Sequence, residues 1–281
     1  TRVTSFNKIG LIGMGDMGFS VAKYLTKSNY SVLTNIDNRS EKSKNNAKKS
    51  NSQIVSFENL ILNSQFIISI IPPSASQQTA KNISFYSKKL SKPVIYIDAN
   101  AISPKTTLDI ENDFYKNAEQ SSIYIDGSII GGPPNDNYKP NLYLSGKNIK
   151  KIDKMKSNAF NIINLGEETK LASSLKMCYA SWTKGSSALI ISMLLLAEKS
   201  NVLFQLLDEL NYSQKELITK MIKTFPSISE KSYRWIAEME EIASTYYENE
   251  LNPGALDNAS SIYKLISGNK NKLAKFLNQI N

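Results

Sequence analysis

The sequence predicts an α/β protein in which a doubly wound, largely parallel sheet is followed by an all-helical domain. Over residues 1–164, short apolar runs of strand length alternate with amphipathic helical patterns, and from residue 165 only helical patterns remain. This alternation is typical of a parallel sheet covered by helices on both faces. The chain has 281 residues, more than a typical single core holds. We therefore expect two domains, residues 1–164 and 165–281.

The first strand is expected at Ile9–Ile12, and it leads into a turn rich in glycine. Gly13, Gly15 and Gly18 fit the spacing G-x-G-x-x-G, which allows a tight turn, close approach of a pyrophosphate and close packing of the next helix. That helix would begin near Asp16 and point free N–H groups at the ligand. The alternatives are a plain turn or a secretory apolar segment, which Asp16 and the glycines would interrupt. We predict a Rossmann-type dinucleotide site contacted by Gly13, Met14, Gly15, Asp16, Met17 and Gly18.

The remaining strands and helices of the first domain follow in alternation. Strands are expected at Tyr30–Ile36, Gln65–Ile71, Val94–Asp98, Ser122–Asp126 and Leu142–Ser145, and helices at Glu41–Lys49, Ser76–Ser87 and Pro104–Gln120. In doubly wound sheets the ligand lies at the carboxyl ends of the strands. Candidate ligand contacts are therefore the residues directly after the strands, at Asp37–Ser40, Pro72–Ser76, Asn100–Ser103 and Gly127–Pro134.

The second domain is predicted to be helical throughout. Helices are expected at Glu167–Lys199, Val202–Leu210, Ser213–Phe225, Ser229–Asn249 and Pro253–Ser267. Ser213 and Glu216 have capping-box spacing, and Gly268 is suited to a C-terminal cap. The apolar run at residues 188–197 is too short to span a bilayer, so a buried helix and no membrane partner are expected.

The helix around Lys176 has two different faces. One face carries a lysine and small residues, Lys176, Ala180, Thr183 and Ser187, and the other carries Leu175, Cys178, Trp182 and Leu189. A lysine on a small-residue stripe is typical of the lining of a cleft, although a lysine extending along the edge of a helix gives the same pattern. Cys178 is expected in the core rather than as a nucleophile.

The composition excludes several kinds of chemistry. The chain has no histidine, so proton transfer must use Lys, Tyr, Asp, Glu, Cys or the ligand, and no metal site is predicted. Its single cysteine cannot form an intrachain disulfide, which suits a cytoplasmic protein. The net charge is +9, but the lysine clusters at 42–49 and 147–156 lack interleaved aromatic residues. A solvated surface is the expected reading, and no nucleic-acid partner is predicted.

Four segments of the chain resemble the β-hydroxyacid dehydrogenases, which include 3-hydroxyisobutyrate dehydrogenase and 6-phosphogluconate dehydrogenase. "IGLIGMGDMG" resembles their nucleotide loop, "YIDANAISP" the segment beside the nicotinamide, "IDGSIIGGPP" the substrate loop, and "SLKMCYA" the helix of the catalytic lysine. "ASWTKGSSALI" and "RWIAEMEEIA" resemble a less characterised branch whose C-terminal helical domain has no assigned substrate.

The resemblance implies roles for individual residues. Lys176 would be the general acid or base, Asn100 would lie near the nicotinamide, and Gly131 and Gly132 would offer backbone donors to the substrate. Ile71 and Pro72 are further cofactor contacts expected after a strand. The chain has Ile130 where the family has serine, and Ala180 where the family often has asparagine. The substrate is then not the standard small hydroxy acid, or it is held by Ile130 and other groups such as Asn135, Tyr179 and Thr183.

The segment "IDNRS" after the second expected strand bears on the choice of cofactor. Asn38, Arg39 and Ser40 resemble the family's NADP-binding turn, and a guanidinium suits a phosphate. Asp37 would instead suit the ribose of NAD. NADP is predicted, with NAD as the alternative.

The predicted function is hydride transfer between a nicotinamide and a hydroxy or carbonyl compound, with Lys176 moving the proton. Reduction is the favoured direction, because a protonated lysine can donate directly. Two alternatives stay open: an imine reductase, which would not need the lysine, and a non-catalytic NADP-binding sensor.

The helical domain is also expected to carry a subunit interface. An apolar stripe runs along Trp235, Met239, Ile242 and Tyr246, and the resemblance implies a homodimer through the C-terminal helices. Arg234 and Glu238 have i,i+4 spacing and are expected to form a solvated ion pair.

Overall fold

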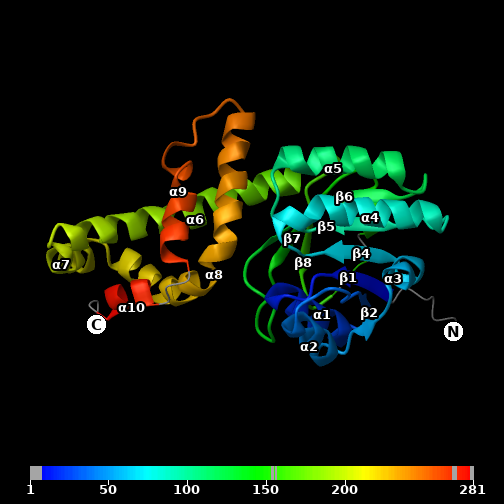
Figure 1. Ribbon diagram of the computed structural model, residues 1–281, viewed down its shortest axis with the longest axis horizontal. Coiled ribbons are helices and arrows are strands. Elements are labelled where there is room, and N and C mark those ends of the chain that lie inside the picture. Colours follow the sequence, from blue (N-terminus) through cyan, green and yellow to red (C-terminus); the bar gives the residue numbers. More distant parts are fainter. Residues whose placement is uncertain (1–7, 153–154, 156, 268–270, 279–281) are drawn as a thin grey trace. The chain divides into compact units, whose positions relative to one another are not determined.

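The computed structural model describes residues 8–152, 155, 157–267 and 271–278 (Figure 1). The chain divides between Lys176 and Met177 into two compact units. We call them the sheet unit, which ends at Lys176, and the helical unit, which begins at Met177.

Within the described residues, the sheet unit is built on eight strands in the spatial order β3-β2-β1-β4-β5-β6-β7-β8. The chain enters at a central position and builds outward in both directions, so the predicted doubly wound sheet is confirmed. All neighbouring strands are parallel except β6 and β7, which pair antiparallel. The bounds are β1 (Lys8–Ile12), β2 (Ser31–Thr34), β3 (Gln53–Ile54), β4 (Phe66–Ser69), β5 (Ile95–Asp98), β6 (Ile123–Ile130), β7 (Asn141–Ser145) and β8 (Asn161–Asn164).

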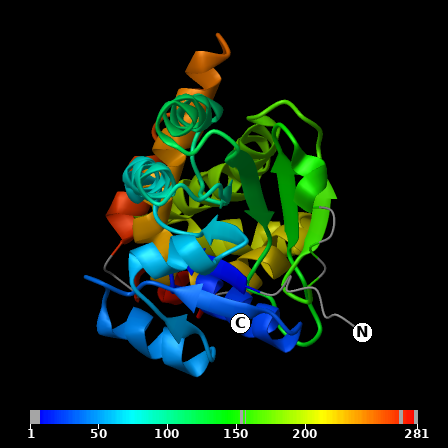
Figure 2. The same cartoon turned by 90° about the vertical axis from the view of Figure 1, so that its right-hand side faces the viewer.

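Helices cover both faces of this sheet. They are α1 (Asp16–Lys27), α2 (Glu41–Lys49), α3 (Phe57–Asn63), α4 (Ser76–Lys89) and α5 (Pro104–Asn117), with short 3-10 turns at Pro73–Ala75 and Ile149–Ile152. Alternate strand residues enter two cores: Leu11 packs with Val21 of α1, whereas Ile67 packs with Ile83 of α4. Helices α4 and α5 lie side by side on the second face (Figures 1 and 2).

Three short elements, β3, α3 and β8, were not predicted, and β6 is longer than predicted. The expected strand ended at Asp126, where Gly127 and Ser128 interrupt the apolar pattern, but β6 continues to Ile130. The extension is stabilised by antiparallel pairing with β7, in which Gly127 lies opposite Leu144. Pairing with a neighbouring strand, which the local sequence of β6 does not reveal, thus sets the end of β6.

The helical unit consists of most of α6 (Leu171–Lys199), α7 (Leu203–Ser213), α8 (Lys215–Glu248), α9 (Ala259–Ile266) and α10 (Asn271–Leu277), with a 3-10 turn at Gly254–Leu256. Its core is formed by buried residues of all five helices, among them Ile191, Leu207, Met221, Tyr263 and Phe276. An all-helical second part is therefore confirmed.

The two helices predicted at Ser213–Phe225 and Ser229–Asn249 form a single helix, α8, with Pro226 in its interior. Proline removes one helical hydrogen bond, but Phe225 and Ile228 on either side of it are buried, and their packing offsets this cost. The predicted capping box is wrong, because Ser213 ends α7 and its hydroxyl donates to the carbonyl of Glu209 at 2.9 Å. The predicted cap at Gly268 lies outside the described residues.

The two faces of α6 are the reverse of the sequence expectation. Trp182, Leu189 and Leu196 are 69%, 62% and 67% exposed, whereas Ala180 of the small-residue face is buried in the helical core. Cys178 is exposed, so its predicted place in the core is wrong. The small residues let α6 pack closely on its neighbours, and the apolar side chains are left outside.

The run at residues 188–197 lies within α6, a helix of 29 residues. Among the described residues, α6 is the one helix long and apolar enough by length and composition to cross a membrane. Buried helices of globular cores meet the same criterion, and Ile191, Leu194 and Ala197 of α6 are buried in the core of the helical unit.

Candidate active site

The glycines of the turn after β1 have different surroundings. Gly13 has a φ of +106°, and a Cβ atom there would overlap the carbonyl oxygen of Ile70. A Cβ atom on Gly18 would overlap the carbonyl oxygen of Gly13, so this helix could not approach the turn with any side chain there. Gly15 differs, since a Cβ atom there would meet nothing within 4 Å. Two glycines are required by the fold, and Gly15 leaves open space beside the turn.

The first turn of α1 is open to an anion. In the described chain, α2, α3 and α5 begin at serines whose hydroxyls accept a backbone hydrogen bond, whereas no side chain caps α1 at Gly15. The N–H groups that any helix presents at its first turn and the positive end of the helix dipole favour a phosphate there.

The other predicted residues of this turn have different surroundings. Met14 is buried, and its carbonyl oxygen accepts a hydrogen bond from the Asn46 side chain at 2.8 Å. Asp16 forms a salt bridge of 2.6 Å with Lys42 of α2, and Met17 packs against the core. The side chains of Met14 and Met17 are therefore taken up by packing in the core.

The turn after β2 presents an exposed cation. Asn38 has a φ of +57°, and the Arg39 N–H donates to the carbonyl of Ile36 at 3.1 Å. The tight turn leaves Arg39 exposed at the surface. The Ser40 hydroxyl caps α2 by accepting from the Ser43 N–H at 3.3 Å.

Asn100, which follows β5, is buried and fully engaged. Its Oδ1 accepts from the Ile71 N–H at 2.7 Å, and its Nδ2 donates to Ser69 Oγ at 2.9 Å and to Asp98 Oδ1 at 2.6 Å. Ile71 is buried and Pro72 is exposed at the end of β4. The Asn100 side chain thus fixes the turn after β4 instead of presenting its amide outward.

Asp98 lies at the centre of this network. It is 2% exposed and also accepts a hydrogen bond from the Tyr124 hydroxyl at 3.1 Å. Burial raises the pKa of Asp98 to about 7, and the nearby Asp126 carboxylate acts in the same direction. Burial likewise raises the pKa of Tyr124 well above its ordinary value. Sequence reasoning missed this group, because alternation in a strand does not distinguish a buried carboxylate from an exposed one.

Asp126 lies directly beside Asp98 in the register of β5 and β6. One oxygen, Oδ2, accepts hydrogen bonds from the Ser145 hydroxyl and from both the N–H and the hydroxyl of Ser173. Burial raises the pKa of Asp126 to about 6, and these hydrogen bonds oppose the rise. Asp126 therefore joins β6, β7 and the first turn of α6.

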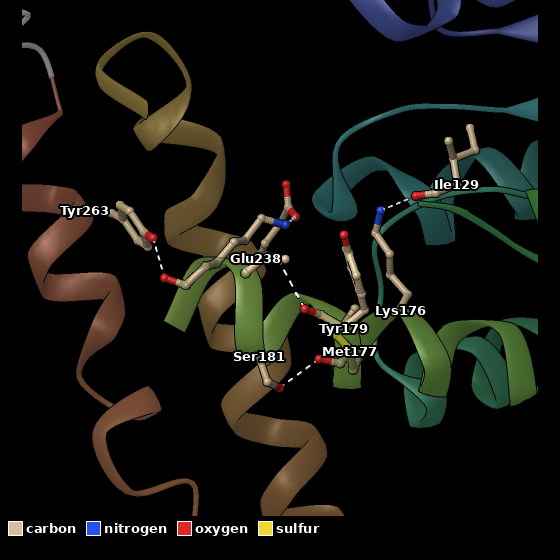
Figure 3. Close-up of polar contacts among 9 residues, drawn as sticks. Ile129, Lys176, Met177, Tyr179, Ser181, Glu238 and Tyr263 are labelled. Carbon is tan, nitrogen blue, oxygen red and sulfur yellow. Dashed lines mark hydrogen bonds and ion pairs between the residues drawn. The ribbon is translucent and has the colours of Figure 1, made fainter. Parts of the chain in front are cut away.

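Lys176 lies one turn further along α6. Its Nζ donates a hydrogen bond to the main-chain carbonyl of Ile129, near the carboxyl end of β6 (Figure 3). Since β6 is parallel to β1, β4 and β5, this is the edge of the sheet at which the glycine turn, Ile71 and Asn100 also lie. The sheet unit thus brings the predicted lysine to the predicted cofactor edge.

The loop after β6 continues from this point. Ile130 is half-buried, and Gly131 and Gly132 are exposed. Gly131 has a φ of +129°, and a Cβ atom there would overlap the Tyr138 hydroxyl. Asn135 closes a turn by accepting the Asn137 N–H at 3.0 Å. The two glycines therefore expose main chain beyond the lysine.

The remaining predicted residues belong to the helical unit. Tyr179 is 50% exposed, and the Thr183 hydroxyl donates to the carbonyl of Tyr179 within α6. Glu238, expected in a solvated pair with Arg234, instead has a largely buried side chain that forms a salt bridge with Lys184. The Tyr263 hydroxyl donates to the Lys184 carbonyl at 2.6 Å (Figure 3). Lys184 and Glu238 lie 54 residues apart, so no local pattern predicts their salt bridge.

The comparisons with known proteins agree with this geometry. Residues 8–157 match the NAD binding domain of 6-phosphogluconate dehydrogenase, and residues 197–266 match a domain of unknown function (DUF1932). An uncharacterized 28.5 kDa protein of Methanothermus fervidus is 28% identical over 218 residues, which are 77% of this chain and 81% of that protein.

Two solved structures have the same fold. A 3-hydroxyisobutyrate dehydrogenase of Mycobacterium tuberculosis is similar with a TM-score of 0.73 and 12% identity, covering 98% of this chain and 99% of that one. An imine reductase of Pseudomonas sp. is similar with a TM-score of 0.54 and 16% identity, covering 92% of this chain and 93% of that one. Since the NAD-binding domain model matches residues 8–157, more than half of the 281 residues, the chain belongs to the β-hydroxyacid dehydrogenase family of NAD(P)-dependent dehydrogenases.

Proposed function

We propose that the protein is an NADP-dependent oxidoreductase that transfers hydride between the nicotinamide and a hydroxy or carbonyl compound, with Lys176 as general acid or base. One observation carries the proposal. The Lys176 ammonium donates to the Ile129 carbonyl at the carboxyl end of β6, on the same sheet edge as the glycine turn of β1. A proton donor and a dinucleotide-binding turn at one edge are the two components that carbonyl reduction requires.

The residues of the sheet unit fit a bound dinucleotide. The uncapped first turn of α1 and the open space beside Gly15 suit the pyrophosphate. The exposed Arg39 suits the additional phosphate of NADP, because a guanidinium can form two parallel hydrogen bonds with it. Asp37 remains the ribose ligand of the alternative, NAD. When bound, the cofactor supplies or accepts the hydride.

Lys176 would act on the substrate oxygen. In the reducing direction the ammonium donates a proton to the oxygen of the carbonyl group, so we favour an aldehyde, ketone or ketoacid as the physiological substrate. The exposed main chain at Gly131 and Gly132 would hold the substrate, and the apolar Ile130 would contact it. Tyr179 and Thr183 of α6 are further candidates for substrate contact.

The second candidate is an imine reductase, favoured by the structural similarity to the Pseudomonas enzyme. The test is NADPH oxidation measured across matched panels of carbonyls and imines. Turnover of carbonyls alone supports the proposal. Turnover of imines alone would replace it, and NADPH binding without turnover of either panel would indicate a sensor.

The exposed apolar residues of α6 support a homodimer through the C-terminal helices. Trp182, Leu189 and Leu196 recur every seven residues and therefore lie along one side of α6. In contrast, Met239 and Ile242 of the predicted stripe on α8 are buried within their own unit, so α6 is the better interface. A Leu189→Glu variant that is monomeric by light scattering, beside a dimeric unmodified protein, is the expected result. A cytoplasmic location, proposed from the single cysteine, can be checked by cell fractionation.

A further inference from the structure

A single carboxylate oxygen connects the sheet to the start of α6. Asp126 Oδ2 accepts from the Ser173 N–H at 2.9 Å, from the Ser173 hydroxyl at 3.1 Å and from the Ser145 hydroxyl at 3.2 Å. The Ser145 hydroxyl in turn accepts from the Ala172 N–H at 3.0 Å. Two of the N–H groups that every helix leaves unpaired at its start are thus bound by side chains of β6 and β7.

The same strand and the same helix meet a second time one step further on. Ser173 and Lys176 are three residues apart on α6, and Asp126 and Ile129 are three residues apart on β6. Hydrogen bonds join Asp126 to Ser173, and a further hydrogen bond joins Ile129 to Lys176. Because a lysine side chain has many rotamers, its ammonium stays at one point only if the backbone that carries it is fixed.

We propose that Asp126 is a positioning residue, whose carboxylate fixes the first turn of α6 against β6 and so holds the Lys176 ammonium at the carbonyl of Ile129. This inference rests on the proposed function, since it assigns Asp126 a task only if Lys176 transfers the proton. Asp126 is 2% exposed and acts through Lys176, without contact to substrate or cofactor.

Burial of Asp126 makes its hydrogen bonds to Ser173 and Ser145 sensitive to pH. The titratable groups that interact with it are Asp98 on β5 and Tyr124 on β6, whereas Ser145 and Ser173 contribute only neutral hydrogen bonds. The raised pKa of Asp126, about 6, means that the carboxylate takes up a proton as the pH falls below 6. A protonated carboxyl accepts fewer hydrogen bonds, so turnover of the unmodified protein is expected to fall on this acid side.

The test compares Asp126→Asn with two control variants. Asn has the same shape but lacks the second acceptor oxygen and the charge. Ser64→Ala removes a buried hydroxyl at the end of α3, one that has no hydrogen-bond partner among the described residues. Ser87→Ala removes a buried hydroxyl that donates to the Lys92 carbonyl, away from Asp126 and Lys176. It therefore controls for the loss of stability that follows when any buried hydrogen bond is removed.

For Asp126→Asn we expect kcat to fall about 10- to 100-fold, because small displacements of a catalytic group have effects of this size. NADPH affinity and the kcat of both controls should change less than about threefold, and the acid limb of the pH profile should disappear. Amide hydrogen exchange of residues 172–176, measured without cofactor, should accelerate in Asp126→Asn alone. Combined with Lys176→Ala, the substitution should cause no further loss of kcat, since both act through one group.

Three results would overturn the inference. The first is a kcat of Asp126→Asn equal to that of the controls. If Lys176→Ala still loses turnover in that case, the positioning role fails and the proposed function holds. Additive losses in the double variant would show that Asp126 acts independently of Lys176. If Lys176→Ala itself retains normal kcat, the proposed function fails, and the positioning role fails with it.

Discussion

The carboxyl edge of the sheet has two regions that differ in exposure. At the turns after β1 and β2, Gly15 and Arg39 are exposed, and no side chain caps α1 in the described chain. At the ends of β5 and β6, Asp98, Asn100 and Asp126 are 2%, 4% and 2% exposed, and each makes several hydrogen bonds. The first region has groups available for a ligand, whereas the second has its groups bound to the protein.

The difference separates binding from positioning. An exposed cation or amide can exchange water for a phosphate at little cost to the fold. A buried carboxylate is costly unless it is hydrogen-bonded, and once it is bonded it fixes the elements that it joins. Substitutions in the exposed region should therefore change cofactor affinity, and those in the buried region should change turnover and stability.

The largest expected effect separates two glycines of the same turn. In Gly18→Ala the new methyl group overlaps the Gly13 carbonyl, so the turn must rearrange and NADPH affinity should fall more than about 100-fold. The free energy of unfolding should fall by about 1–3 kcal/mol. In Gly15→Ala the new methyl group meets no atom within 4 Å, so the free energy of unfolding should not change. NADPH affinity should still fall, because the methyl group occupies space that the pyrophosphate would use. Fluorescence titration measures NADPH affinity, and urea denaturation measures the free energy of unfolding. Unchanged NADPH affinity in Gly18→Ala would contradict the assignment of this turn to the cofactor.

Arg39→Ala should have the next largest effect. Hydrogen bonds to charged groups contribute about 1.5–3 kcal/mol, so the Kd of NADPH should rise about 10- to 100-fold while that of NADH changes little. Lys44→Ala, which removes another exposed cation from the neighbouring helix α2, is the matched control and should affect neither. If the unmodified protein binds NADH more tightly than NADPH, the preference is wrong and Asp37 becomes the ribose ligand.

The smallest effect is a pH dependence of stability that arises in the buried region. The pKa of Asp98 is about 7 in the folded protein against an ordinary value of 3.8, so the folded state holds a proton that the unfolded state releases. The free energy of unfolding should therefore decrease as the pH rises from about 4 to about 7. Asp98→Asn should reduce this decrease by at least about 1 kcal/mol, with Asp126 contributing the rest of it.

Urea denaturation at pH 5 and pH 8 measures this difference. Asp113→Asn, which changes an exposed carboxylate on α5, should behave like the unmodified protein. An unchanged difference between the two pH values in Asp98→Asn would show that Asp98 is not buried as a protonated group.

Much of this architecture follows from local sequence, and the exceptions have physical causes. Apolar and alternating patterns predicted six of the eight described strands, and the glycine spacing located the turn after β1, because both are properties of neighbouring residues. The pattern could not show that packing carries α8 through Pro226, or that the apolar face of α6 is exposed. It could also not show that Asn100 is turned inward, since the partners of that side chain come from β4 and β5.

The central claim is that Lys176 transfers the proton, and the kinetics of Lys176→Ala test it most directly. With the carbonyl substrate found in the NADPH oxidation panel, turnover should fall about 100- to 10,000-fold, because a positioned acid or base contributes about this much. NADPH affinity should stay within about threefold, since Lys176 belongs to α6 and not to the glycine turn. Lys199→Ala, at the exposed end of the same helix, should turn over normally. A Lys176→Ala variant that binds NADPH and reduces the carbonyl at nearly the normal rate would contradict the account and make Tyr179 the next candidate donor.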